Sequence, residues 1–107
     1  PAPPPPTIHE AERESGPAGG VLYGGELDFA AAVARRALRG DVVVRGDDTD
    51  ANRHLAEQIE SAVGPCERGE PHSRAGPGAL PHYQPVPRPP DGHTFYETAR
   101  RKARKKR

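Results

Sequence analysis

Three histidines lie close together in the C-terminal third of the chain. His72, His82 and His93 fall within 22 residues of a Pro/Gly-rich stretch that has no amphipathic helix pattern. An imidazole titrates near neutral pH, so one ring can accept a proton while another donates one. Prolines restrict the backbone around such loops and hold side chains in place. We therefore expect an acid/base site in which His82 and His93 form the working pair and His72 assists.

Arginines and hydroxyl groups are interleaved with these histidines. A planar guanidinium binds phosphate through two parallel hydrogen bonds, and Tyr or Thr hydroxyls can donate to a developing oxyanion. Together these groups suit metal-independent RNA cleavage, in which a base activates the ribose 2′-hydroxyl and an acid protonates the leaving 5′-oxygen. The candidate catalytic residues are His72, His82, His93 and Tyr96, and the candidate substrate-binding residues are Arg74, Tyr83, Arg88 and Thr94.

A zinc site is the alternative use of the three histidines. Their spacings of ten and eleven residues match no compact zinc motif. The single cysteine, Cys66, excludes a multi-Cys zinc site and an internal disulfide. The sequence also has no Walker loop and no dinucleotide-binding fingerprint. We expect neither a metal nor a cofactor.

Charge is distributed unevenly along the chain. Residues 97–107 hold seven Lys/Arg and one acidic residue, whereas residues 1–96 hold nine Lys/Arg and 14 Asp/Glu. A basic tail on an acidic body indicates a polyanionic partner, although a solvated end would show the same composition. The candidate nucleic-acid-binding residues of this tail are Arg100, Arg101, Lys102, Arg104, Lys105, Lys106 and Arg107.

Apolar periodicity predicts two helices and several short strands. Residues 26–39 carry a helical apolar stripe, and so does a second segment that Thr49 or Asp50 is expected to cap and that runs to about Val63. Val42–Val44 predicts a buried strand, and a short stretch at Val21–Tyr23 ends at a Gly pair. Two further strands are expected near residues 82–86 and 93–96, with His93 and Phe95 on one face and Thr94 and Tyr96 on the other.

These elements predict an α+β fold, with two helices packed on a small, mostly antiparallel sheet and a Pro/Gly-rich active-site segment. Residues 1–20 are expected to form a Pro-rich linker or arm, residues 21–96 the catalytic domain and residues 97–107 the basic tail. No run of 18 apolar residues occurs, so no membrane span is expected. Because the chain starts with Pro and lacks Met, we expect it to be part of a longer polypeptide.

Short Pro-, Gly- and His-containing motifs follow one another in the C-terminal third. They are Pro71-His72, Gly76-Pro77, Leu80-Pro81-His82-Tyr83-Gln84-Pro85 and Gly92-His93-Thr94-Phe95-Tyr96. With these motifs the chain resembles the variable tips of bacterial polymorphic toxins of the Rhs and contact-dependent-inhibition type. The resemblance covers about Asp41–Tyr96, and its specific part is Pro71–Tyr96. Gln84 stands where those tips often have a histidine, which weakens a metal-binding version of the site.

The resemblance implies a small antibacterial ribonuclease that is delivered from the producing cell as part of a larger protein. It would act on RNA in the target-cell cytoplasm and be neutralised by a cognate immunity protein. From the basic groups around the histidines we expect that immunity protein to be acidic. Two alternatives remain at this point: a non-enzymatic nucleic-acid or protein-binding module, and a toxin of other chemistry, such as a DNase or a nucleotide-modifying enzyme.

Overall fold

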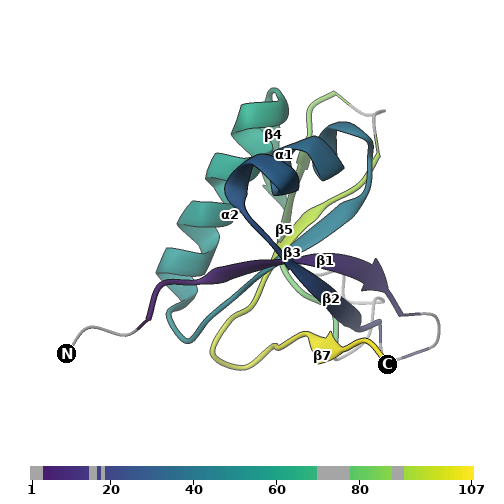
Figure 1. Ribbon diagram of the computed structural model, residues 1–107, viewed down its shortest axis with the longest axis vertical. Helices are drawn as coiled ribbons and strands as arrows, with labels where there is room; N and C mark the ends of the chain where they lie inside the picture. Colours follow the sequence, from purple (N-terminus) through teal and green to yellow (C-terminus); the bar gives the residue numbers. More distant parts are fainter. Residues whose placement is uncertain (1–3, 15–16, 18, 70–77, 88–90) are drawn as a thin grey trace.

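Two helices pack on one face of a mixed, mostly antiparallel sheet, which confirms the α+β class (Figure 1). The computed structural model describes residues 4–14, 17, 19–69, 78–87 and 91–107. Within these ranges the strand order is β4-β5-β6-β3-β1-β2-β7, and β3–β6 and β2–β7 are the parallel pairs. In chain order the elements are β1 (Thr7–Arg13), β2 (Val21–Leu27), α1 (Phe29–Ala37), β3 (Asp41–Arg45), α2 (Thr49–Val63), β4 (Cys66–Gly69), β5 (His82–Pro85), β6 (Thr94–Tyr96) and β7 (Arg104–Lys105).

Short acidic caps fix where the two helices begin. The Asp28 carboxylate accepts a hydrogen bond from the Ala31 amide at 2.7 Å, so α1 begins at Phe29 and not at Glu26 as the apolar stripe suggested. The side chain of Asp48 caps α2 in the same way, one residue before the expected Thr49 or Asp50. The apolar periodicity therefore identified both helices correctly but placed the start of α1 three residues early.

The first twenty residues contain a central strand, where a linker or arm was expected. β1 pairs with β3 on one side and with β2 on the other, and Ile8 and Ala11 are buried in it. With only one large apolar side chain, Ile8, this strand is stabilised largely by backbone hydrogen bonds to two neighbours, which composition does not reveal. β2 likewise continues through Gly24 and Gly25, where the sequence suggested an end, because β1 pairs along it.

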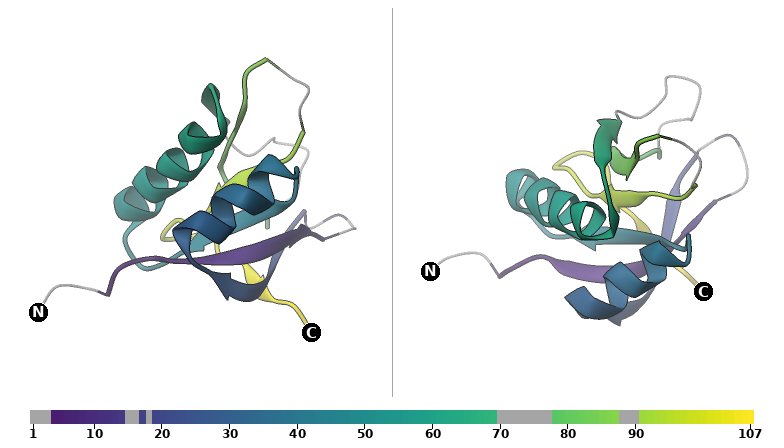
Figure 2. Two further views of the ribbon diagram at one scale, coloured as in Figure 1. Left: turned by 45° about the horizontal axis from the view of Figure 1, so that its top comes forward. Right: turned by 90° about the horizontal axis from the view of Figure 1, so that it is seen from above.

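The sheet has a buried core on each face. The two helices cover the first face, as both views in Figure 2 show. On the second face, Leu80 and Ala103 pack against the sheet, so the segment before β5 and the C-terminal segment cover it. The buried residues of the first core are Ile8, Ala32, Val42, Val44, Ala56, Ile59, Tyr83 and Tyr96, and those of the second are Ala11, Val21, Val43, Leu80, Phe95 and Ala103.

A buried ion pair joins the two helices to the sheet. Arg36 of α1 and Glu60 of α2 are 2% and 1% exposed, and two hydrogen bonds of 2.8 and 3.1 Å link the guanidinium to the carboxylate. Thr94 of β6 donates a third hydrogen bond to Glu60 at 2.8 Å. The Arg36 guanidinium also donates to the Gly40 and Asp91 carbonyls. Both charges are therefore compensated within the core, as burial requires.

We predict that Glu60→Gln lowers the free energy of unfolding by about 3–5 kcal/mol, because it leaves the Arg36 cation buried without its counter-charge. Asp50→Asn is the matched control, since it breaks the exposed Asp50–Arg53 pair of α2 and should cost less than about 1 kcal/mol. Urea denaturation followed by circular dichroism measures both. Equal losses in the two variants would contradict a central role for the buried pair.

Candidate active site

The structure brings His82 and His93 into contact. His82 is the first residue of β5 and His93 directly precedes β6, and β5 pairs with β6. Their ring centroids are 4.3 Å apart in an edge-to-face arrangement. Phe95 stacks on the His93 ring at 5.2 Å, with an interplanar angle of 5°. The two histidines that the sequence predicted as an acid/base pair therefore share one site on the second face of the sheet, together with Phe95.

A hydrogen-bonded chain of side chains orients the His82 ring. Nε2 of His82 lies 3.1 Å from Oε1 of Gln84, and the amide nitrogen of Gln84 donates to the Glu67 carboxylate at 3.1 Å. Because this arrangement uses the Gln84 oxygen as an acceptor, His82 carries its hydrogen on Nε2. In the neutral ring, Nδ1 is then the nitrogen that can accept a proton. Gln84 thus selects a tautomer of His82.

Backbone contacts with β3 hold His93 in place. The His93 amide donates to the Asp41 carboxylate at 2.8 Å, and the His93 carbonyl accepts from the Val42 amide at 3.2 Å. His93 is 9% exposed, whereas His82 is half-buried. The pair therefore has a more accessible ring, His82, and a second ring that is enclosed and fixed by the sheet.

Arg13 is a cation next to Asp41, the residue that holds the His93 backbone, and the sequence reasoning missed it. Its Nε lies 3.6 Å from Oδ2 of Asp41, whose other oxygen accepts the His93 amide. The Arg13 side chain is 64% exposed and so can reach a ligand. Arg13 belongs to the segment that composition assigned to an arm, and its position beside Asp41 follows from the pairing of β1 with β3. Nothing in the sequence of residues 1–20 indicated that Arg13 is a candidate site residue.

Three predicted hydroxyl groups lie on the other face of the sheet. Thr94 is fully buried and donates to Glu60, and the rings of Tyr83 and Tyr96 pack 6.0 Å apart in the core under the helices. The expected alternation along residues 93–96 is present, since Phe95 joins the second core and Tyr96 the first. The same alternation separates Tyr83, Thr94 and Tyr96 from the histidine pair. His72, Arg74 and Arg88 lie outside the described residues.

The basic tail is packed on the sheet. The Glu97 carboxylate, which is 3% exposed, accepts hydrogen bonds from Arg45, the Gly46 amide and the Ala103 amide. Arg101 donates to the Ala79 carbonyl and Lys102 to the Gly46 carbonyl. Arg104 and Lys106 form ion pairs with Glu14 and Glu12. The exposed tail residues are Arg100, Lys102, Arg104, Lys105, Lys106 and Arg107.

Two further observations bear on what the site can bind. Among the described residues, no group of three His, Cys, Asp or Glu side chains is arranged to hold a metal ion. None of the helices in the described part of the chain is both long and apolar enough to cross a membrane. The groups that contact His82 and His93 include each other's imidazoles, the Gln84 amide and the Asp41 carboxylate, and the two imidazoles are groups that suit proton transfer.

Tyr83 has the perturbed acidity expected of a buried phenol. Burial raises the pKa of Tyr83 above its usual value of 10, and the nearby Glu57 carboxylate raises that pKa further. The folded protein therefore holds this proton at a pH where the unfolded chain releases it. The contribution of the Tyr83 phenol to the free energy of unfolding is fully present below about pH 10, and it falls as the pH rises above that value.

We predict that Tyr83→Phe removes a tyrosine transition that lies above the usual tyrosine pKa in an ultraviolet titration. Glu57→Gln should move that transition back toward the usual value, because it removes the second cause of the shift. Tyr23→Phe is the control and should leave the transition in place. If Tyr83→Phe instead removes a transition at or below the usual tyrosine pKa, the phenol is not desolvated.

Comparison with known proteins gives no match to this chain: no family model, no curated protein and no solved structure is similar to it. The geometry of the His82–His93 pair is therefore the basis on which a function is proposed.

Proposed function

We propose that this chain is a metal-independent ribonuclease in which His82 and His93 act as general acid and base. The single observation that carries the proposal is the contact between the two rings, whose centroids lie 4.3 Å apart. Two imidazolium ions at this distance repel each other, so the arrangement favours one charged and one neutral ring over two charged rings. One ring then serves as base while the other serves as acid, which is what RNA transesterification needs.

In the proposed reaction the base takes the proton of the ribose 2′-hydroxyl, and the 2′-oxygen attacks the adjacent phosphorus. The bond to the 5′-oxygen breaks as the acid protonates that oxygen, leaving a 2′,3′-cyclic phosphate and a 5′-hydroxyl. This reaction consumes no water molecule and requires no metal ion. In this proposal the exposed Arg13, which pairs with Asp41, would compensate the charge of the phosphorane, a role that sequence reasoning gave to Arg74 and Arg88.

The resemblance of Pro71–Tyr96 to polymorphic-toxin tips supports a biological setting for this activity. In the proposed setting the chain is delivered as part of a larger protein and cleaves RNA in the cytoplasm of a target cell. A cognate acidic immunity protein would place Asp or Glu side chains against the Arg13 guanidinium and the histidine rings. Such a partner imitates the phosphate of the substrate and associates faster at low salt.

Replacing either histidine should abolish most of the cleavage. We expect His82→Ala and His93→Ala each to lower kcat about 10²–10⁴-fold, the contribution of one general acid or base. His54→Ala is the matched control, because His54 is exposed on α2 and should leave kcat unchanged. Cleavage of a fluorescent RNA by purified protein, with folding checked by circular dichroism, measures the effect. Full activity of both site variants would refute the proposal.

The pH and metal dependence give an independent test. We expect a bell-shaped profile of kcat/KM against pH, because the reaction requires one protonated and one neutral ring. We also expect full activity in EDTA, since no step uses a metal ion. Activity that is lost in EDTA and restored by zinc or magnesium would favour the zinc or DNase alternative. Product analysis should show 2′,3′-cyclic phosphate ends.

A further inference from the structure

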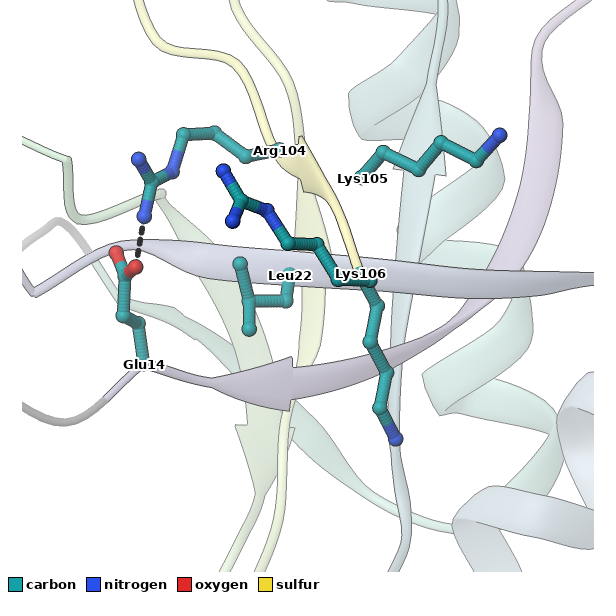
Figure 3. Close-up of a pocket in the computed structure, with 6 residues that line it drawn as sticks. Glu14, Leu22, Arg104, Lys105 and Lys106 are labelled. Atoms are coloured by element: carbon teal, nitrogen blue, oxygen red, sulfur yellow. Dashed lines mark hydrogen bonds and ion pairs between the residues drawn. The ribbon is translucent and has the colours of Figure 1, made fainter.

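The C-terminal residues form a basic hollow at the edge of the sheet where β2 pairs with β7. We call it the tail hollow; it measures about 590 Å³ and is open to the surface. Four of its lining side chains are basic, Glu14 is the acidic one, and Leu22 lies at its base (Figure 3). The residues that line it are Glu14, Leu22, Arg104, Lys105, Lys106 and Arg107. A surface of this charge is complementary to a polyanion.

Backbone pairing fixes the positions of these cations. Arg104 pairs with Leu22 and Lys105 with Tyr23 in a parallel register, and the Lys106 amide donates to the Tyr23 carbonyl at 2.8 Å. Alternation along β7 sends the Arg104 and Lys105 side chains in opposite directions, which Figure 3 shows clearly. Cations therefore flank both sides of this strand, so an extended polyanion that follows the edge meets positive charge on each side.

Two carboxylates of the β1 segment already bind two of these cations. Glu14 is ion-paired with Arg104, and Glu12 lies 2.7 Å from the Lys106 ammonium group. Lys105 is exposed and, among the described residues, has no ion-pair partner. The Glu12–Lys106 pair is exposed at both residues, whereas the Glu14–Arg104 pair is exposed at Arg104 and partly buried at Glu14. An exposed ion pair contributes little to stability, typically less than about 1 kcal/mol, so a phosphate can replace the Glu12 carboxylate in particular at small cost. Glu12 and Glu14 thus occupy positions where phosphates would bind.

We propose that the tail hollow binds the phosphodiester backbone of RNA, and that Glu12 and Glu14 weaken this binding by competing for Lys106 and Arg104. The proposal rests on the proposed ribonuclease function for the identity of the polyanion. Four interstrand steps separate β6 from β7, roughly 19 Å at about 4.8 Å per step. The tail hollow is thus a second substrate contact, distant from the His82–His93 pair, that a longer RNA reaches and a dinucleotide does not.

The test measures binding separately from cleavage. A fluorescent 2′-O-methyl oligonucleotide cannot be cleaved by attack of a 2′-hydroxyl, so its anisotropy reports binding whether or not the histidines are catalytic. We expect the Glu12→Gln/Glu14→Gln double variant to bind more tightly than wild type. The gain in affinity is about fivefold per freed cation near 0.1 M salt. Each added phosphate contact on a single strand changes the slope of log affinity against log salt concentration by about −0.7.

A matched control separates local competition from total charge. Asp50→Asn/Glu57→Gln makes the same change in net charge on α2 and also releases a cation, Arg53, from an exposed ion pair. This control should change the affinity and the salt dependence much less than the Glu12/Glu14 variant. Equal gains in the two double variants would overturn the assignment of the site to the tail hollow.

Two further measurements keep the result interpretable. Lys105→Gln removes a cation without breaking an ion pair and should weaken oligonucleotide binding. This variant still tests the proposal if the loss of Glu12 and Glu14 loosens β7. Cleavage of a dinucleotide should be unchanged in all tail variants, so a failed ribonuclease assay and a failed binding assay are distinguishable. If polyglutamate of equal charge binds as tightly as the oligonucleotide, the tail hollow is a protein-docking surface and the assignment to RNA is wrong.

Discussion

The buried ion pair between Arg36 and Glu60 is the constraint on which the rest of the structure depends. Two ions cannot leave water unless each finds a counter-charge and further hydrogen bonds, and here α1, α2 and β6 each supply one part. Gly92 packs directly against the Arg36 guanidinium with a φ of +99°, and a Cβ added there would lie 2.4 Å from Nη1. The ion pair thereby fixes the backbone that leads into His93.

The same constraint connects the core to the candidate active site. Because Thr94 donates to Glu60 beneath the helices, the alternation of β6 directs Phe95 to the second face, where it packs with both histidine rings. Asp41, at the start of β3, holds the His93 amide on that face and lies next to Arg13. The site is thus built on three neighbouring strands, β6, β3 and β1, with His82 added from β5.

A second polar centre plays the corresponding role at the other end of β3. The Glu97 carboxylate binds Arg45, the Gly46 amide and the Ala103 amide, and the Arg45 guanidinium lies over the Tyr23 ring at 3.7 Å. These contacts hold the C-terminal segment across the second face of the sheet, so that β7 lies next to β2 and pairs with it. A tail whose composition indicated a polyanionic partner or a solvated end therefore becomes part of the sheet through β7, which holds Arg104 and Lys105 in register with β2 at one edge.

The sequence by itself determined part of the local structure and identified two residues of the candidate site. Apolar periodicity identified both helices and Val42–Val44, and the types and spacing of His82 and His93 marked the pair that the structure brings together. Tertiary structure decided the place of β1, the position of Tyr83, Thr94 and Tyr96 on the opposite face, and the approach of Arg13 to Asp41. The physical reason is that strands pair through backbone hydrogen bonds between segments distant in the sequence. The side-chain pattern of one segment therefore does not show which other segment it pairs with.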